Sequence, residues 1–366
     1  MNRRVIIAGG GTGGHIFPAI AIANALKKKD ESIEILFVGA KGKMEMEKVP
    51  HAGYKIEGLD IAGFDRSSLI KNIGLPYKII KSLIQARMIM NEFKPDLVIG
   101  VGGYASFPML SLAQQKKIPT VIQEQNSFAG KTNMLLAKRA KKICVAYEGM
   151  EKFFPKEKII ITGNPVRSAI SHSAITKSQG QKYFELDERI KTVLVVGGSL
   201  GAKSINVAIE KHLDDLLNAG LQLIWQTGKP FAVKAKERAD GKKGVWVNQF
   251  IEQMEYAYAA ADVVISRAGA IAIAELCVMK KPVLFVPFPF AAEDHQTENA
   301  MSLVNKNAAM MVKDSEAIDK IVPMIIELAK DENKQEGLKN NISQLAITNA
   351  DEKIADEIIK SLHTSA

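Results

Sequence analysis

The chain alternates short, continuous apolar runs with longer segments in which apolar residues recur at helical spacing. Such runs are typical of parallel strands buried on both faces, with helices between them. The runs span residues 5–8, 33–38, 95–100 and 121–122 in the first half and 193–196, 261–265 and 283–286 in the second. Most of them lead into a glycine turn. This pattern predicts an α/β fold.

The two halves repeat the same order of strand, glycine turn, strand, glycine turn and strand. The glycine turns are residues 9–14 and 102–103 in the first half, and residues 197–201 and 268–270 in the second. We therefore predict two similar α/β domains, residues 1–162 and 163–344, joined at the turn 162–165. A cleft between two such domains would suit a reaction that brings an activated donor to an acceptor.

Two helices can be placed from their ends and faces. The first is expected after His15, with Pro18 in its first turn, where a missing N–H costs nothing, and with cations at its carboxyl end. The last, over residues 351–362, has Ile354, Ile358 and Leu362 on one face. This face predicts that the helix docks on a domain.

Composition adds limits to this picture. A chain of 366 residues is long for one core and sufficient for two, and 47% hydrophobic residues are typical of a globular protein. Cys144 and Cys277 have no ligand-like spacing, so buried, reduced thiols are expected. No apolar run reaches the roughly 18 residues of a membrane span, and no leader precedes the first strand. We expect a soluble, unsecreted protein.

The net charge of +9 calls for an anionic partner. Nucleic acid is disfavoured, because the lysines are scattered and few aromatics lie among them. A phosphate-rich substrate or an anionic membrane surface fits better, because cations surround an apolar stretch from Leu69 to Met90. This stretch has no acidic residue, and its cations are Lys71, Lys78, Lys81 and Arg87. It could be a helix packed on the sheet with solvated lysines, or an apolar patch with a basic rim that rests on a bilayer.

The first glycine turn, Gly9-x-Gly11-x-x-Gly14, formally matches the dinucleotide-binding fingerprint. A nicotinamide site also needs an acid after the second strand, where this chain has Gly-Ala-Lys-Gly at residues 39–42. Only a 2′-phosphorylated dinucleotide would suit Lys41, which leaves a dehydrogenase as a minor alternative. The Walker pattern is absent, because no Gly-Lys-Ser/Thr ends either turn. The helix N-termini predict binding of phosphate or of a developing oxyanion.

A third turn, residues 266–270, opens a helix rich in small residues, which would let its backbone approach a ligand closely. Glu275 follows about two turns into this helix. If the helix N-terminus holds a diphosphate, the carboxylate could reach ribose hydroxyls. An exposed helix glutamate is the alternative interpretation.

Six motifs resemble those of the MurG family in order and spacing. They are GGTGGHIFP at 10–18, GGY at 102–104, EQN at 124–126, GNPVR at 163–167, GGSLGA at 197–202 and SRAGA at 266–270. This resemblance covers residues 5 to 310. The family transfers N-acetylglucosamine (GlcNAc) from UDP-GlcNAc to lipid I, which forms lipid II for peptidoglycan synthesis.

The resemblance implies the GT-B fold, in which two Rossmann-like domains with parallel sheets face a central cleft and a C-terminal helix, residues 345–366, packs back on the first domain. It also implies transfer to the 4-hydroxyl of the lipid-linked N-acetylmuramyl pentapeptide, with inversion. The protein would be peripheral, on the cytoplasmic face of the bacterial inner membrane. Cell-wall and cell-division proteins are candidate partners, and nucleic acid is not.

The same resemblance implies a role for each matching residue. Donor contacts are implied for Arg167, Ser199, Ala270, Ile271 and Ala272 with the diphosphate, Glu275 with the ribose, Ile251 with the uracil, and Gln296 and Asn299 with the sugar. The facing wall would be lined by Thr12, Gly13, Gly14 and Asn126, and the acceptor side by Gly103, Tyr104 and Glu124. Many relatives have His where this chain has Gln123 and Thr where it has Ala272. No base is therefore assigned to position 123, and at position 272 only the backbone amide remains for the phosphate.

The chemistry of transfer can be assigned from the residues. No Asp-x-Asp motif, the usual metal holder of sugar transferases, occurs in the sequence. We therefore expect Arg167 and a helix N-terminus to stabilise the departing UDP without a metal or cofactor. His15 is the best-placed base for the acceptor hydroxyl, although it could instead cap the helix or bind substrate.

Two other classes of function remain open. One is a different GT-B enzyme, such as a glycolipid glycosyltransferase or a UDP-GlcNAc epimerase. The other is a nucleotide-sugar-binding protein without catalytic activity.

Overall fold

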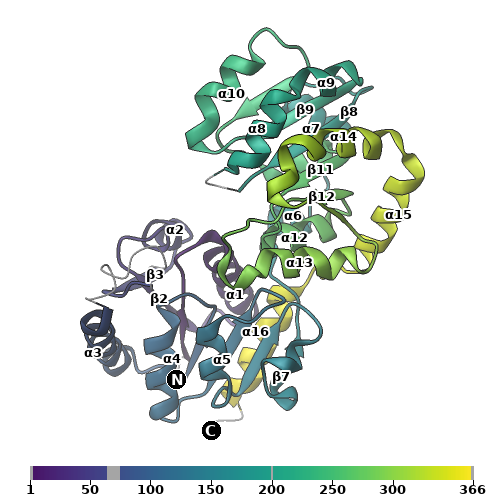
Figure 1. Ribbon diagram of the computed structural model, residues 1–366. Helices are drawn as coiled ribbons and strands as arrows, with labels where there is room; N and C mark the ends of the chain where they lie inside the picture. Colours follow the sequence, from purple (N-terminus) through teal and green to yellow (C-terminus); the bar gives the residue numbers. More distant parts are fainter. Residues whose placement is uncertain (1–2, 64–74, 199–200, 364–366) are drawn as a thin grey trace. The chain divides into compact units, whose positions relative to one another are not determined.

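The computed structural model describes residues 3–63, 75–198 and 201–363 (Figure 1). The chain forms two compact units. Unit 1 comprises Met1–Val166 and Asn349–Ala366, and unit 2 comprises Arg167–Thr348. The boundary therefore lies after Val166, whereas the sequence pattern put it after residue 162.

Unit 1 is built on a sheet of seven parallel strands in the order β3-β2-β1-β4-β5-β6-β7. The strands are β1 (Arg4–Ala8), β2 (Glu34–Ala40), β3 (Lys55–Leu59), β4 (Leu97–Gly100), β5 (Thr120–Glu124), β6 (Lys142–Val145) and β7 (Ile159–Ile161). The strand order reverses between β1 and β4, which is where open α/β sheets bind their ligands. Both glycine turns of the first half follow these two strands.

Helices cover the sheet of unit 1. They are α1 (Gly13–Lys29), α2 (Glu45–His51), α3 (Leu75–Phe93), α4 (Ser106–Gln115), α5 (Lys131–Ala137) and α16 (Ala350–His363), with 3-10 turns at Met150–Lys152 and Lys156–Lys158. Successive β1 side chains belong to different core clusters, with Ile6 in one and Val5 and Ile7 in the other. This alternation buries both faces of the strand, as the continuous apolar run predicts.

Helix α1 begins earlier than expected. Thr12 is extended, and its carbonyl accepts the N–H groups of both His15 and Ile16. Gly13 and Gly14 therefore already belong to the helix, His15 lies in its first turn, and Pro18 lies in the second turn. The predicted start after His15 is wrong, because the cap is formed by the backbone of Thr12 ahead of the glycines.

The C-terminal helix α16 packs beside α1 in unit 1 (Figure 1). Ile354, Ile358 and Leu362 are buried in the core cluster that also holds the apolar face of α1. Two ion pairs border the contact, Lys28 with Glu352 and Lys29 with Asp356. The apolar face of the last helix therefore docks on unit 1, as predicted.

Helix α3 contains the described part of the stretch from Leu69 to Met90; residues 64–74, with Lys71, lie outside the described residues. Its buried positions are Ser82, Ala86 and Met90. Its exposed apolar side chains are Tyr77, Ile79, Ile80, Ile84 and Met88.

Unit 2 repeats the topology of unit 1. Its six parallel strands run in the order β10-β9-β8-β11-β12-β13, which matches β3-β2-β1-β4-β5-β6 of unit 1 position by position. The strands are β8 (Lys191–Val196), β9 (Leu221–Gln226), β10 (Val245–Asn248), β11 (Val263–Ser266), β12 (Val283–Phe285) and β13 (Met310–Met311). The predicted pair of parallel α/β folds is confirmed. That the two sheets face a cleft stays a prediction.

The helices of unit 2 lie around this sheet. They are α6 (Ser168–Ser171), α7 (Lys177–Tyr183), α8 (Lys203–Lys211), α9 (Leu213–Asn218), α10 (Ala232–Ala239), α11 (Met254–Ala260), α12 (Ala270–Val278), α13 (His295–Val304), α14 (Ala317–Lys330) and α15 (Glu332–Ser343), with 3-10 turns at Lys229–Phe231, Ala292–Asp294 and Asp314–Glu316. Among the described residues Trp225 of β9 is the largest fully buried side chain, and its indole N–H donates to Asn206 Oδ1.

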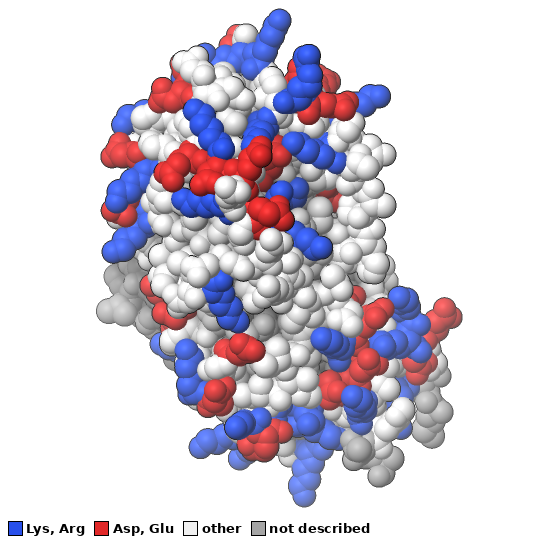
Figure 2. Space-filling view, turned by 90° about the vertical axis from the view of Figure 1, so that its right-hand side faces the viewer, with Lys and Arg blue, Asp and Glu red and all other residues white. Residues whose placement is uncertain are grey.

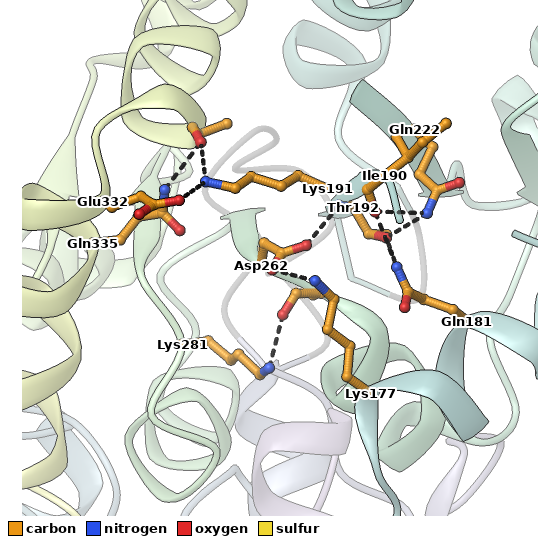
Figure 3. Close-up of polar contacts among 12 residues, drawn as sticks. Lys177, Gln181, Ile190, Lys191, Thr192, Gln222, Asp262, Lys281, Glu332 and Gln335 are labelled. Atoms are coloured by element: carbon orange, nitrogen blue, oxygen red, sulfur yellow. Dashed lines mark hydrogen bonds and ion pairs between the residues drawn. The ribbon is translucent and has the colours of Figure 1, made fainter. Parts of the chain in front are cut away.

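A polar network ties the amino end of β8 to its neighbours (Figure 3). The Asp262 carboxylate accepts the Thr192 N–H at 2.8 Å and the Lys177 ammonium at 2.7 Å. The Lys281 ammonium, just beyond α12, donates to the Ala261 carbonyl at 2.7 Å. Burial lowers the pKa of Lys281 to about 8, against the opposing attraction of Asp262.

The charged side chains are scattered over the surface, as the sequence indicates. On the face shown in Figure 2, basic and acidic side chains are interspersed and form no single basic stripe. None of the helices in the described ranges has the length and apolar character needed to span a bilayer.

Candidate active site

The two glycine turns of unit 1 lie against each other. The Gly10 N–H donates to the Gly102 carbonyl at 3.2 Å, and the Val101 N–H donates to the Ala8 carbonyl at 3.0 Å. A Cβ atom on Gly103 would lie 2.3 Å from the Gly10 carbonyl oxygen. Only glycine permits this approach, so the turn that precedes His15 and the turn that precedes Tyr104 form one surface.

His15 is oriented by both turns. Its Nδ1 lies 2.9 Å from Thr12 Oγ1, and a Cβ atom on Gly102 would lie 2.6 Å from its Nε2. In the tautomer whose Nδ1–H donates to Thr12, the lone pair is on Nε2, as a general base requires. Thr12 and Gly14 are exposed and Gly13 is half-buried, so this turn is open to solvent.

Glu45 was not predicted to belong to the site. It is the first residue of α2 and only 1% exposed. Its carboxylate accepts the N–H of Gly11 and the N–H of Ala40, each at 3.0 Å. One N–H of the turn expected to bind phosphate is therefore already bonded within the protein.

Glu124 lies at the end of β5 and is 2% exposed. Its Oε1 accepts the Asn126 N–H at 3.1 Å, and its Oε2 accepts the Gly130 N–H at 3.0 Å and Asn133 Nδ2 at 2.8 Å. The carboxylate thus shapes the loop that presents Asn126. A direct contact between Glu124 and an acceptor stays a prediction.

Gln123, where many relatives have His, is fully buried in a network of amides. Its Nε2 donates to Asn164 Oδ1 at 3.2 Å, and Asn164 Nδ2 donates to the Gln125 carbonyl at 2.9 Å. The Gln125 side chain donates to the Val101 carbonyl at 2.7 Å. The network connects the segment before unit 2 to the second glycine turn.

Tyr104, predicted on the acceptor side, is 53% exposed. A Cβ atom on Gly63 would lie 1.9 Å from its ring, so the ring rests on that glycine. Unit 1 thus brings together Thr12, Gly13, Gly14, His15 and Gly103, with Tyr104 beside them.

In unit 2, Arg167 and Glu275 form an ion pair. Arg167 Nε donates to Glu275 Oε1 at 2.9 Å, and the Tyr258 hydroxyl donates to Oε2 at 3.0 Å. Burial lowers the pKa of Arg167, but the charge and hydrogen bond of Glu275, together with Tyr258 and Glu255, outweigh burial, and the net shift is upward. Burial, together with Glu275, raises the pKa of Tyr258 well above its usual value. Glu275 is 4% exposed, so the exposed-glutamate interpretation is wrong.

Helix α12 begins beside this pair. Gly269 is its N-cap, and the first intrahelical bond runs from the Ile273 N–H to the Gly269 carbonyl at 3.0 Å. The amides of Ala270, Ile271 and Ala272 precede that bond. An N-terminus of this kind attracts anions, and the helix carries Glu275 as well.

Gln226, also not predicted, joins two loops of unit 2. Its Nε2 donates to the Gly198 carbonyl at 3.1 Å, and its Oε1 accepts the Ile251 N–H at 3.1 Å. It therefore fixes the glycine turn after β8 against the segment expected to meet uracil. Because the Ile251 N–H donates to Gln226, a backbone contact between Ile251 and uracil would use the Ile251 carbonyl. Ser199 lies outside the described residues.

The two residues predicted to read the sugar differ in accessibility. Gln296 Oε1 accepts the Phe288 N–H at 2.9 Å, and the residue is half-buried. Asn299 is fully buried, and its Nδ2 donates to the Ala268 carbonyl at 3.4 Å. In this structure Asn299 supports the turn before α12. Its predicted sugar contact remains untested.

Arg267 also supports that turn, which the sequence did not indicate. Its Nη1 donates to the carbonyls of Val286 and Pro287 and to Asp314 Oδ1 at 2.6 Å. In the described parts of the chain, no three His, Cys, Asp or Glu side chains are grouped to hold a metal ion.

Comparison with known proteins relates both units to one family. Residues 5–145 match the glycosyltransferase family 28 N-terminal domain, and residues 192–358 match the glycosyltransferase family 28 C-terminal domain. The crystal structure of MurG from Acinetobacter baumannii superposes with a TM-score of 0.79 at 30% identity, covering 98% of this chain and 99% of that one.

Two relatives bear the name UDP-N-acetylglucosamine–N-acetylmuramyl-(pentapeptide) pyrophosphoryl-undecaprenol N-acetylglucosamine transferase. The one from Parabacteroides distasonis is 53% identical over 98% of this chain and 98% of its own. The one from Phocaeicola vulgatus is 52% identical over 98% of this chain and 96% of its own. The chain belongs to the MurG family. The predicted GT-B fold and the predicted class of enzyme, a glycosyltransferase, are confirmed for this MurG-family chain.

Proposed function

We propose that the protein transfers GlcNAc from UDP-GlcNAc to the 4-hydroxyl of the N-acetylmuramyl pentapeptide of lipid I, forming lipid II for peptidoglycan synthesis. The observation that carries this proposal is identity above 50% over nearly the whole length of relatives named for that transfer. Both of these relatives are named for this transfer, and neither bears the name of another GT-B activity.

In the proposed step, the acceptor oxygen attacks the anomeric carbon of GlcNAc from the face opposite UDP. The bond between that carbon and the phosphate oxygen breaks, its electron pair leaves with UDP, and the configuration inverts. The hydroxyl proton passes to a base, for which we propose His15. Its contact with Thr12 fixes the ring in an orientation compatible with a lone pair on Nε2.

Negative charge that develops on UDP needs a stabiliser. Within the described residues, Arg167 donates a hydrogen bond only from its Nε, to Glu275, so its two Nη nitrogens can bind another group. We assign these nitrogens and the α12 N-terminus to the diphosphate. Glu275 accepts two donors in this structure, and a carboxylate has about four acceptor sites. It can therefore bind ribose hydroxyls and keep Arg167 in place. No metal is required by this arrangement.

We propose that α3 docks unit 1 on the bilayer that carries the lipid-linked acceptor. Its exposed face combines Tyr77, Ile80, Ile84 and Met88. One correction applies to the basic rim. Lys81 pairs with Asp60 at 3.0 Å, so it is already neutralised, and of the predicted cations in the described range Lys78 and Arg87 remain. Placement at the cytoplasmic face of the inner membrane follows from the proposed acceptor.

The decisive experiment incubates purified protein with radiolabelled UDP-GlcNAc, with and without lipid I in detergent, and separates the products by lipid extraction. We expect label in the lipid phase only when lipid I is present. Conversion of the UDP-sugar without acceptor would instead identify an epimerase. Tight binding of UDP with no consumption of donor in the presence of lipid I would identify a binding protein and refute the proposed transfer.

A further inference from the structure

We propose that Glu45 is a positioning residue for the transfer reaction: it holds the glycine turn after β1 in the one shape that orients His15. The proposal rests on the role proposed for His15. Glu45 would touch neither donor nor acceptor and would act through the turn.

The contacts of Glu45 are those of an internal anion. The residue is 1% exposed, and its two carboxylate oxygens accept backbone N–H groups from two different segments, Gly11 and Ala40. No ion pair with a described Lys, Arg or His neutralises it. Burying a carboxylate without a cation costs free energy of folding. A neutral side chain would suffice if this position served only packing, so the carboxylate points to a specific role.

The protein leaves room for this side chain on two sides. A Cβ atom on Gly10 would lie 2.4 Å from Glu45 Oε1, and a Cβ atom on Gly39 would lie 2.5 Å from its Cγ. Glu45 therefore fills the space that a side chain at either glycine would need. The carboxylate occupies the Gly11 N–H of the turn, and backbone N–H groups of this turn bind the phosphate in dinucleotide-binding folds. This occupation explains physically why the fingerprint of the first turn does not make a dinucleotide site.

The contact with Gly11 leads on to His15. Glu45 accepts the Gly11 N–H, and the preceding residue, Gly10, bonds to Gly102 at 3.2 Å. The imidazole lies between Gly102 on one edge and the Thr12 hydroxyl on the other. If the turn shifts, both edges of the ring lose their neighbours together.

The main test is Glu45→Gln, which keeps size and shape but places an NH2 group against one of two backbone N–H donors. The control is Asp96→Asn. Asp96 lies in the same unit before β4, and its carboxylate accepts the Arg4 N–H at 2.8 Å. The chemical change, an acid to its amide, is thus the same, but it lies at the amino end of β1 instead of the carboxyl end.

We expect Glu45→Gln to lower kcat at least about tenfold, because small displacements of a catalytic group have effects of that size. The affinity for UDP, which unit 2 is proposed to bind, should stay within about twofold of the parent. Asp96→Asn should leave kcat per folded molecule unchanged. A second variant, Gly39→Ala, should displace the Glu45 side chain without removing its charge, and its effect should not add to that of Glu45→Gln.

A measurement independent of turnover uses 15N-histidine-labelled protein, whose six histidines give separate NMR signals. The His15 signal is assigned by its loss in His15→Gln. We expect Glu45→Gln and Gly39→Ala to change the tautomer and the titration midpoint of His15, and Asp96→Asn to change neither. If the parent transfers no GlcNAc, the proposed function fails but the NMR result still decides on Glu45. The inference is overturned if Glu45→Gln affects His15 no more than Asp96→Asn does.

Discussion

At the scale of single residues, the tautomer of His15 determines whether its ring can accept a proton. The Thr12 hydroxyl at Nδ1 can fix that tautomer. Replacing it by a methyl group in Thr12→Val should lower kcat about 10–100-fold, the size of effect that loss of an orienting partner has for metal-binding histidines. Thr12→Ser keeps the hydroxyl and should retain most of the activity. Steady-state kinetics with lipid I distinguishes these outcomes, and equal activity of both variants would assign His15 another role.

The donor residues should separate into two classes. Glu275→Ala removes the proposed ribose acceptor and the partner of Arg167, so UDP itself should bind more weakly. Gln296→Ala should spare UDP affinity and reduce turnover or sugar selectivity, because a site built for a hydroxyl is left with unpaired groups when that hydroxyl moves. Calorimetric titration with UDP and kinetics with UDP-GlcNAc measure the two effects. Similar losses of UDP affinity in both variants would contradict this division.

Leaving-group stabilisation can be tested in the same way. Arg167→Ala removes a charged contact proposed for the departing diphosphate, and should cost about 2–4 kcal/mol of transition-state stabilisation. Turnover should persist in EDTA, because the proposed stabilisers are all protein groups. A loss of more than about tenfold in EDTA, restored by Mg²⁺, would show that a metal does this work.

Residue types alone predicted the glycines and His15 but not the residues that support them. Glu45 lies in a charge-rich segment, KGKMEMEK, that looks like a solvated helix start. Its burial depends on Gly10 and Gly39, which approach it only in the folded sheet. Gln226 is similarly the last residue of an apolar strand, and nothing in its sequence indicates that it joins two loops.

At the scale of elements, the apolar runs were the most informative feature. Continuous burial makes β1, β4, β8 and β11 recognisable from sequence, because both of their faces must be apolar. The start of α1 was missed because Gly13 and Gly14 are poor helix formers, although the Thr12 carbonyl caps them. The pairing of Lys81 with Asp60 was missed because the two residues lie on different elements.

Lys281, at the turn between α12 and β12, should make stability depend on pH. Burial lowers its pKa from 10.5 to about 8 in the folded protein. Between these values the unfolded chain binds the proton and the folded one does not, so this group makes the free energy of unfolding rise with pH. Below about pH 8 both states are protonated, and the burial penalty of at most about 3 kcal/mol is fully present.

Lys281→Met should therefore reduce the increase of the free energy of unfolding with pH. The free energy of unfolding is measured by urea unfolding of parent and variant at pH 7.5 and pH 10. The change between the two pH values is then compared between the two proteins, because other groups that titrate in this range affect both equally. The parent should gain more stability than the variant over this interval. Parallel changes in the two proteins would show that Lys281 is solvated in solution.

At the scale of the whole molecule, the sequence repeat correctly indicated two units with one topology. The order 3-2-1-4-5-6 occurs in both sheets, and the docking of α16 on unit 1 follows from one apolar helix face. The total charge was less informative. A net charge of +9 could be read from composition, but which cations are available depends on folded neighbours such as Asp60. Hydrogen bonds from Lys81, Gln85 and Lys41 lower the pKa of Asp60 to about 2.

Membrane docking is the prediction that belongs to the whole molecule. Lys81 should be left intact in its test, because a carboxylate at that position would face Asp60 and disturb α3 itself. The informative variant is Lys78→Glu with Arg87→Glu, both exposed on α3. Its control is Lys236→Glu with Lys243→Glu, which makes the same change in net charge on exposed positions of unit 2.

Each cation near an anionic surface contributes about 1 kcal/mol, so the α3 variant should bind vesicles containing phosphatidylglycerol at least about tenfold more weakly than the parent. Binding of the parent should fall with added salt, and UDP affinity should be the same in all three proteins. Vesicle co-sedimentation at low and high salt measures these differences. If the α3 variant and the unit 2 control lose binding equally, attraction follows net charge alone, and α3 is an ordinary surface helix. If only the α3 variant loses binding, its exposed apolar face is directed to the bilayer, since local charge would then matter and total charge would not.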